Sequence, residues 1–314
     1  MAEKHSIPIL SEDDLKALGI TTQEVIESIE NLIRASEDGR AWSAPKAVIQ
    51  PGDGRYMMAA LAAADEPSLL AVKTVVLNPD NPNHGLPQIN GLVTMLDGQS
   101  GLPAAIMDGN WITAVRTAGL SATAARYLAR EDSSVVGFVG TGVQARSHLD
   151  TFADMFPLEA VRIFGRGQVN IDTLGAYAES KGLTATVVDS GGEALDEADL
   201  VVTSITATAQ IEPFLHAARM KPGGFAAVTD LGVPWRDETL SAFDRLIIDD
   251  IEQEKSLPGK IAPPDCISGD LRQLVLGQVP GRESDQQVTG FFFRGHAFGD
   301  LALGSLCYRK GGFA

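Results

Sequence analysis

The spacing of hydrophobic residues changes twice along the chain. Two capping boxes begin at Ser11 and Thr21, and apolar residues then recur at helical spacing over 25–33, which predicts helices. Between residues 55 and 108, short apolar runs alternate with clusters of Gly, Pro, Asn and Asp, which predicts strands joined by turns. Residues 112–130 are rich in alanine and predict another helix.

The second half of the chain has continuous rather than alternating apolar strands. The expected strands are 135–140, 161–165, 184–188, 200–205, 225–229 and 245–250. Strands that are apolar on both faces, with helical segments between them, indicate a parallel sheet covered by helices. We therefore expect an α/β protein with a doubly wound Rossmann domain at 119–300. Residues 1–118 are expected to form an α+β domain, to which the apolar tail at about 301–314 returns.

Composition narrows the range of partners. The chain of 314 residues has 41 acidic and 25 basic residues, giving a formal net charge of −16. This charge argues against nucleic acid and anionic membranes as partners, but it allows a small anionic ligand in a locally basic cleft. The two cysteines and five scattered histidines form no metal-binding pattern, so no metal is expected. The sequence shows neither a signal peptide nor an apolar run of about 18 residues, so we expect a cytoplasmic protein.

The glycine-rich turn after the first of these continuous strands reads G-x-G-x-x-A and opens a helix. The candidate cofactor-binding residues here are Gly140, Gly142, Val143 and Gln144, followed by Ala145. The first glycine permits a tight turn, the second lets the backbone approach a pyrophosphate, and the alanine lets the helix pack closely on the strand. The phosphate would bind the exposed N–H groups at the positive end of the helix dipole. We predict a dinucleotide site; a plain tight turn is the alternative.

The sequence leaves NAD(H) and NADP(H) open. An NAD site usually has a carboxylate about 20 residues after the glycines, which binds the ribose hydroxyls. Arg166 follows the second strand instead, and would stack on the adenine, pair with a 2′-phosphate, or lie exposed in a loop. Thr203, Ser204 and Thr206 end the fourth strand, where they either face the cofactor or bond within a turn.

The chain resembles the ornithine cyclodeaminase/mu-crystallin family in four segments: AVKTVVLNPDN, GLPQINGLVTMLDGQSGLPAAIMDG, WITAVRTAGLSATAARYLAR and VGTGVQA. The resemblance covers nearly the whole chain, and the D-G-x-x-[LI]-T-x-x-R-T-A block at 108–118 is its most specific part. It implies a substrate-binding and dimerising α+β domain, a Rossmann domain, a homodimer, and NAD(H) or NADP(H) as cofactor. It also implies ornithine cyclodeamination, alanine dehydrogenation, or reduction of cyclic or linear imines to amino acids.

The resemblance assigns substrate-site residues one by one. Lys46 takes the place of an arginine that binds the substrate carboxylate, and it keeps the charge but not the bidentate fork. Lys73 matches the active-site lysine near the reacting carbon, and we expect it to be catalytic and to bind substrate. Arg116 matches an arginine at the junction of cofactor and substrate, so we expect it to bind both.

One departure from the family concerns a proton carrier. Cyclodeaminases have an aspartate two residues before a proline that matches Pro234. In this chain that position is Gly232, and the nearest acid is Asp230. The loss of the carboxylate favours imine reduction over cyclodeamination, although a slip of one or two residues in the alignment would return Asp230 to the role.

A second departure lies near the end of the chain. Arg294 stands where the family has a small or aliphatic residue in the pocket for the substrate side chain. An arginine there would form a second anion clamp, because its fork binds carboxylates bidentately; a surface ion pair is the alternative. His296 is a candidate proton donor, or else a packed or capping histidine. The inferred substrate is then a dicarboxylate.

We predict a nicotinamide-dependent reduction of a small anionic 2-imino acid to an L-amino acid, most sharply of iminosuccinate to L-aspartate. Lys73, His296 or a held water would protonate the imine nitrogen. The alternatives are a cyclodeaminase-type lyase that uses NAD catalytically, an alanine dehydrogenase or cyclic ketimine reductase, and a non-enzymatic, crystallin-like binding protein.

Overall fold

The computed structural model describes residues 6–206, 211–257 and 259–313. The chain divides into two compact units, of which unit 1 contains Met1–Arg116 with Ala297–Ala314, and unit 2 contains Thr117–His296. Each unit has one sheet, and the mixed α/β class predicted from the sequence is confirmed. Among the described residues, none of the helices is both long and apolar enough to cross a membrane.

Unit 1 contains a six-stranded sheet in the order β1-β6-β5-β4-β3-β2. Neighbouring strands are antiparallel, except that β1 runs parallel to β6. The strands are β1 (Ile9–Leu10), β2 (Ala41–Ile49), β3 (Tyr56–Asp65), β4 (Ser68–Leu77), β5 (Ile89–Asp97) and β6 (Pro103–Asp108). The helices are α1 (Glu12–Ala17), α2 (Thr22–Glu37), the 3-10 helix η1 (Asn81–His84) and α9 (Ala297–Lys310), and the boundary with unit 2 falls within α3 (Gly109–Leu128).

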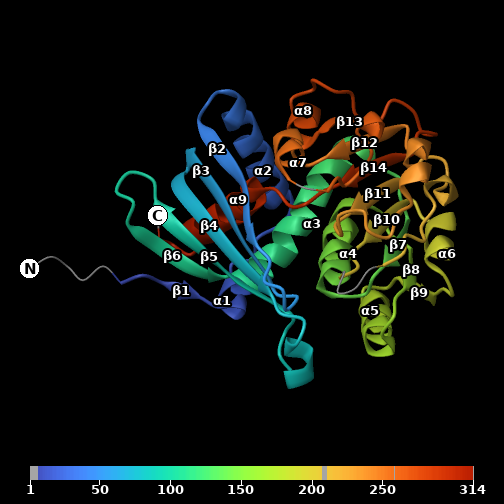
Figure 1. Cartoon of the computed structure of the whole chain (residues 1–314), viewed down its shortest axis with the longest axis horizontal. Helices are drawn as coiled ribbons and strands as arrows, with labels where there is room; N and C mark the ends of the chain where they lie inside the picture. Colours follow the sequence, from blue (N-terminus) through green and yellow to red (C-terminus); the bar gives the residue numbers. More distant parts are fainter. Residues whose placement is uncertain (1–5, 207–210, 258, 314) are drawn as a thin grey trace, which may run out of the picture. The chain divides into compact units, whose positions relative to one another are not determined.

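One face of this sheet is covered by helices. Helix α9 packs on β3, β4 and β5, and α2 packs on α9 and β2 (Figure 1). Because side chains alternate along a strand, every second residue of β4 lies on the covered face, and these residues are buried: Leu69, Ala71, Lys73 and Val75. The period of two therefore places the charged Lys73 on the same face as the apolar core.

Unit 2 contains an eight-stranded parallel sheet in the order β13-β12-β14-β11-β10-β7-β8-β9. Its strands are β7 (Val135–Val139), β8 (Ala160–Phe164), β9 (Thr184–Val187), β10 (Leu200–Thr203), β11 (Phe225–Val228), β12 (Arg245–Ile248), β13 (Ile267–Asp270) and β14 (Thr289–Phe292). Between them lie α4 (Val143–Met155), α5 (Gln168–Ser180), α6 (Gly191–Asp196), α7 (Ile251–Ser256), α8 (Leu271–Val275) and the 3-10 helices η2 (Ala217–Arg219), η3 (Asp237–Ala242) and η4 (Pro264–Cys266).

The strand order reverses beside β7. The chain passes from β7 to β8 and β9 on one side, and then returns to β10 and β11 on the other. In open parallel sheets, ligands bind outside the carboxyl ends of the strands at such a reversal. The fold therefore points to the ends of β7 and β10 as a ligand site within unit 2.

Candidate functional site

The glycine turn after β7 has the geometry that a close ligand approach requires. Gly140 has a φ of +106°, and a Cβ atom there would lie 2.7 Å from the carbonyl oxygen of Ser204, so only glycine fits without strain. Gly142 caps α4 and has no side chain to bind the first N–H groups of the helix. A Cβ atom on Gly142 would meet nothing within 4 Å. The start of α4 is therefore open in front of its unsatisfied backbone donors.

A cavity of about 370 Å³ lies at this turn. Four of the residues predicted to bind the cofactor line it: Gly140, Gly142, Arg166 and Thr206. The lining also contains Thr141, Phe164, Gly165, Gly167, Asn170, Ser204, Ile205, Ile211 and Phe214. Three further candidates are not in the lining: Val143 and Gln144, which belong to the first turn of α4, and Arg116, which lies in unit 1.

Ser204 supplies a test of whether this cavity fits a polar ligand. Its Oγ is buried and, within the described part of the chain, has no hydrogen-bond partner. By contrast, Thr203 is turned away from the cavity, since its hydroxyl donates to Asp230 Oδ1 at 3.0 Å and accepts from Trp235 Nε1 at 3.3 Å. An unsatisfied hydroxyl beside an open helix N-terminus fits a phosphate- or ribose-bearing ligand.

A second set of functional residues forms a buried charged cluster in unit 1. Lys73 Nζ lies 2.8 Å from Asp300 Oδ1, and Arg116 Nε lies 3.0 Å from the same oxygen. All three side chains are at least nine-tenths buried. Lys46, next to an irregularity in the pairing of β2 with β3, is close enough for its charge to act on Lys73 and Asp300. The structure thus brings three predicted substrate-binding residues together.

The pKa values in this cluster are set by burial and by the neighbouring charges. Burial and the charge of Arg116 lower the pKa of Lys73 to about 7, although Asp300 opposes the change. Burial acts to raise the pKa of Asp300, but the charges of Arg116 and Lys73 outweigh it and hold this pKa below its ordinary value. Lys73 can therefore gain or lose a proton near neutral pH, as a proton donor must.

Arg116 also has a buried donor to spare. Neither Nη1 nor Nε has a hydrogen-bond partner among the residues that the structure describes, and Nε has only its ion pair with Asp300. An unsatisfied buried guanidinium nitrogen costs free energy unless a ligand binds it. A carboxylate would satisfy this donor in a site that is already rich in positive charge.

The D-G-x-x-[LI]-T-x-x-R-T-A block explains how Arg116 is positioned. Asp108 Oδ1 accepts a hydrogen bond of 2.7 Å from the backbone N–H of Trp111, which caps the first turn of α3. A Cβ atom at Gly109 would lie 2.4 Å from the carbonyl carbon of Gly91, so the helix starts tightly against β5. Arg116 follows two turns later on this anchored helix.

Asp300 was not identified from the sequence. It lies in the first turn of α9, within an otherwise apolar tail whose residues are buried from Ala297 to Cys307. The available signal was a lone carboxylate in that apolar run, of the same kind that singled out Lys73 in β4.

The position that carries an aspartate in cyclodeaminases cannot readily hold one in this backbone. Gly232 has a φ of +73°, and a Cβ atom there would lie 2.9 Å from the carbonyl oxygen of Ile261. Asp230 is buried, and it accepts hydrogen bonds from the Thr203 hydroxyl and from the Ile205 N–H, each at 3.0 Å. Burial raises the pKa of Asp230 to about 6. This carboxyl is engaged in holding the strand end that leads to the cavity.

Arg294 and His296 lie in unit 2 and are paired with acids of the chain. Arg294 Nε lies 2.8 Å from Glu254 Oε2, and its Nη2 donates to the carbonyl oxygen of Gly259 at 2.7 Å. His296 Nε2 lies 3.6 Å from Asp250 Oδ2. An ion pair is thus present at Arg294, but it is largely buried, whereas the alternative drawn from the sequence was a surface pair. Whether Arg294 also binds substrate stays a prediction.

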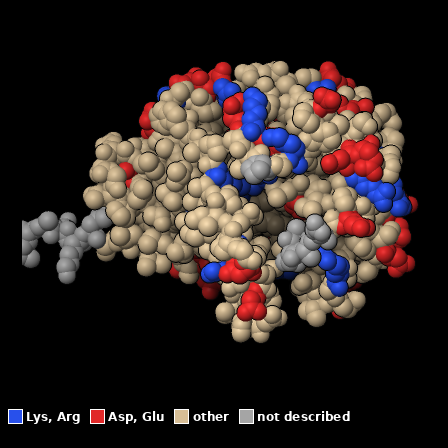
Figure 2. All heavy atoms as spheres, viewed as in Figure 1, with Lys and Arg blue, Asp and Glu red and all other residues tan. Residues whose placement is uncertain are grey.

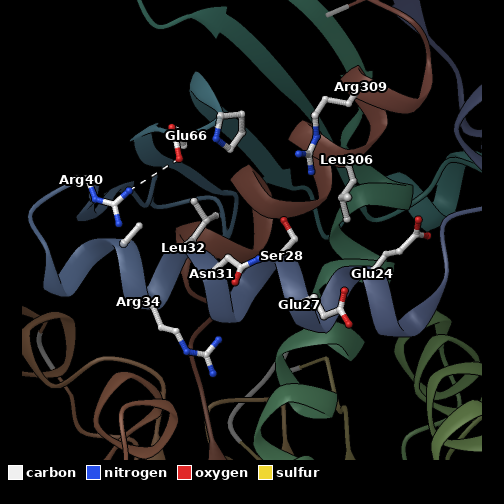
Figure 3. A pocket seen from close by; sticks show the side chains of 12 residues that line it. Glu24, Glu27, Ser28, Asn31, Leu32, Arg34, Arg40, Glu66, Leu306 and Arg309 are labelled. Carbon is white, nitrogen blue, oxygen red and sulfur yellow. Dashed lines mark ion pairs between the residues drawn. The ribbon is translucent and has the colours of Figure 1, made fainter.

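A larger cavity of about 670 Å³ lies in unit 1, beside α2 and α9 (Figure 3). It contains none of the residues predicted for a site. Two of its arginines are bound to acids of the chain, Arg34 to Glu30 at 3.1 Å and Arg40 to Asp38 at 2.8 Å. Within the described ranges, no group of three or more His, Cys, Asp and Glu side chains could hold a metal ion.

Comparison with known sequences identifies relatives along the whole chain. The sequence model of the ornithine cyclodeaminase/mu-crystallin family matches residues 9–311. An alanine dehydrogenase of Archaeoglobus fulgidus is 28% identical, over 96% of this chain and 94% of its own length. The ketimine reductase mu-crystallin of Rattus norvegicus is 32% identical, over 80% of this chain and 79% of its own length.

Solved structures of similar fold contain nicotinamide cofactors. The Δ1-pyrroline-2-carboxylate reductase of Thermococcus litoralis, in complex with NADH and L-proline, superposes with a TM-score of 0.87 at 27% identity, covering 97% of each chain. An archaeal alanine dehydrogenase dimer with bound NAD superposes with a TM-score of 0.83 at 26% sequence identity, covering 97% of each chain. The iminosuccinate reductase of Paracoccus denitrificans with NAD+ superposes with a TM-score of 0.83 at 23% sequence identity, covering 98% of this chain and 96% of its own. At this identity the similarity is one of fold.

Proposed function

The chain belongs to the ornithine cyclodeaminase/mu-crystallin family, and we propose that it uses a reduced nicotinamide cofactor to convert a 2-imino acid into an L-amino acid. Relatives that act on C=N or CH–NH2 groups of amino acids support this reaction class. In this proposal, unit 2 binds the dinucleotide and unit 1 binds the imino acid.

The observation that carries the proposal is the unsatisfied Nη1 of Arg116 within a buried cluster that also contains Lys73 and Lys46. Such a cluster suits the α-carboxylate that every 2-imino acid possesses. Gly140, Gly142, Ser204 and the open start of α4 would hold the pyrophosphate and ribose of the cofactor.

The mechanism divides the work among the residues of the cluster. Arg116 binds and orients the carboxylate, and the neighbouring positive charges stabilise it. When bound, the reduced nicotinamide supplies the hydride that the imine carbon accepts. Lys73, with a pKa of about 7, donates the proton that the imine nitrogen needs to become an amine. Asp300 balances part of the positive charge.

Gly232 favours a reductase over a cyclodeaminase. A side chain at this position would be strained by its left-handed backbone and by the carbonyl oxygen of Ile261. Asp230 is not free to replace the missing carboxylate, because two hydrogen bonds hold it beside β10.

The more specific proposal is that the substrate is iminosuccinate and the product L-aspartate. The charges of Lys46, Lys73 and Arg116 all act on the carboxylate of Asp300, so a ligand with two carboxylates adds further opposite charge beside these three cations. Arg294 would bind the second carboxylate of the substrate only if its ion pair with Glu254 broke first. The second candidate substrate class is a monocarboxylate imine, as the names of the relatives suggest.

A single set of assays tests the activity. The protein is incubated with NADH or NADPH and with oxaloacetate plus ammonia, pyruvate plus ammonia, or Δ1-pyrroline-2-carboxylate, and oxidation of the cofactor is followed. We expect turnover with oxaloacetate plus ammonia. Turnover only with pyruvate or the cyclic imine would overturn the dicarboxylate assignment. Ammonia release from ornithine without net change in the cofactor would overturn the reductase assignment.

We also propose that the protein is a homodimer joined through the uncovered face of the unit 1 sheet. Large apolar side chains on that face are 37–51% exposed: Trp42, Met57, Leu61, Val76 and Leu92. The strand register places them on the side opposite Lys73. Figure 2 shows few charged side chains over the strands of unit 1. An apolar sheet face of this extent suits a self-complementary interface, and the archaeal alanine dehydrogenase relative is a dimer.

A further inference from the structure

Among the described residues, Asp300 is the one carboxylate paired with both Lys73 and Arg116. It accepts a hydrogen bond from Lys73, whereas its contact with Arg116 is an ion pair without hydrogen-bond geometry. A single oxygen, Oδ1, lies 2.8 Å from Lys73 Nζ and 3.0 Å from Arg116 Nε. The three groups come from α9, β4 and α3, so Asp300 ties together elements that are far apart in sequence. Its place in the first turn of α9 also puts the carboxylate near the positive end of the helix dipole, where it is stabilised.

We propose that Asp300 is a positioning residue for a substrate carboxylate. It holds the guanidinium of Arg116 by its Nε side, so that Nη1 stays available for that carboxylate. It also anchors the ammonium of Lys73 beside the carboxylate. The inference rests on the proposed function, because it assigns the role of a further residue in the same anion site. It goes beyond a structural role, since a core ion pair remote from the anion site would not change the proton uptake by Lys73 that accompanies anion binding.

The geometry has an electrostatic consequence. The charged groups that act on Lys73 are Arg116 from α3, Lys46 from β2 and Asp300 from α9. Burial and Arg116 lower the pKa of Lys73 to about 7, and Asp300 is the only one of these groups that raises it. An incoming carboxylate acts in the same direction as Asp300. Binding of an anion should therefore make Lys73 take up a proton.

Proton uptake gives a test that does not require turnover. The full chain, with and without NAD+, is titrated with succinate in a calorimeter, in buffers of different ionisation enthalpy at pH 6. After correction for the proton that succinate itself releases on binding at this pH, which is the same for every variant, a Lys73 pKa of about 7 predicts that the wild type takes up roughly 0.1 proton. In Asp300→Asn the Lys73 pKa falls by about one unit or more, and uptake should rise to roughly 0.5 proton or above.

Two further variants separate this role from a structural one. Glu30→Gln removes another buried carboxylate of unit 1, which pairs with Arg34 at 3.1 Å, and it should leave the uptake unchanged. Asp300→Glu keeps the charge, and it should return the uptake toward the wild-type value. If Asp300→Asn does not fold, Lys73→Arg keeps the pair with Asp300 and should abolish the uptake of about 0.9 proton expected at pH 8.

The outcomes distinguish the two proposals. Equal uptake in wild type and Asp300→Asn, uptake that persists in Lys73→Arg, or absence of succinate binding by the wild type would overturn the role of Asp300. Uptake that changes as expected, in a protein that turns over none of the imines tested, would support the role of Asp300 and overturn the reductase proposal.

Discussion

His148 illustrates how one buried residue can be bonded on all its polar atoms. Its Nε2 lies 2.8 Å from Ser121 Oγ and its Nδ1 lies 2.8 Å from the carbonyl oxygen of Gln144. Because a carbonyl only accepts, Nδ1 carries the proton and Nε2 accepts from the serine hydroxyl. Burial lowers the pKa of this imidazole to about 4. The neutral ring joins α3 to the first turn of α4, next to the dinucleotide cavity.

This pKa predicts a pH dependence of stability. The unfolded imidazole binds a proton below pH 6.5 and the folded one only below about 4. The contribution of His148 is therefore complete above pH 6.5 and is lost as the pH falls through 4, with a maximum loss of about 3 kcal/mol. Urea unfolding at pH 7 and pH 4.5 should show a smaller loss of unfolding free energy in His148→Gln than in the wild type. Equal losses in the two proteins would contradict this assignment.

Single residues differed in how far the sequence revealed them. Lys73 was conspicuous because a charge interrupts an apolar strand. Its partner Asp300 was not found, because the contact joins residues 227 positions apart and no local pattern encodes it. For Arg294 the sequence offered a surface ion pair as the alternative. The pair is largely buried instead, and its partner Glu254 lies in α7, 40 residues earlier, so no local pattern could name it.

Elements were predictable where a continuous run of apolar residues specified them. Strands β7, β8 and β10–β12 and the glycine turn follow from such runs. Strand β2 was not predicted. Its residues are mostly exposed and its pairing with β3 shifts register next to Lys46, so no alternation of apolar and polar residues marks this strand in the sequence. Strand β13 (Ile267–Asp270) has only one large apolar residue, so no apolar run marks it. Strand β14 is inserted between β11 and β12 by tertiary pairing that no periodicity predicts.

The glycine turn gives a prediction at this scale. Gly142→Ala should leave the unfolding free energy within about 0.5 kcal/mol of the wild type, because a Cβ atom there meets nothing within 4 Å. It should weaken NADH binding about tenfold or more, a loss of about 1.4 kcal/mol, because the methyl group enters the space in front of α4. Calorimetric titration with NADH measures this loss.

Gly140→Ala is the matched variant. A Cβ atom at Gly140 would lie 2.7 Å from the carbonyl oxygen of Ser204, and the φ of this residue is +106°. We therefore expect a loss of about 1–3 kcal/mol in unfolding free energy from this variant. NADH binding by Gly142→Ala that equals that of the wild type would remove the turn from the cofactor site.

At the scale of the whole molecule, we expect two copies of the chain to associate through the uncovered face of the unit 1 sheet. Leu61, in β3, is 47% exposed on the uncovered sheet face. Leu61→Arg should weaken dimerisation by about 3 kcal/mol, roughly a hundredfold, because the interface would bury an unpaired charge. Val169→Arg, at a residue of unit 2 that is 78% exposed, is the control and should leave the dimer intact. Sedimentation analysis that finds Leu61→Arg fully dimeric would place the interface elsewhere.

The contribution of α9 to unit 1 bears on how the chain is made on the ribosome. Strands β3, β4 and β5 are translated long before residues 297–310, which cover their apolar face. The ribosome therefore synthesises all of unit 2 while that apolar face is still uncovered by α9. Exposed apolar surface of this kind is prone to aggregation and is bound by chaperones. Lys73 likewise has no Asp300 carboxylate to pair with until residue 300 has been synthesised. A chain that stalls before that codon contains the Lys73 ammonium without this counterion.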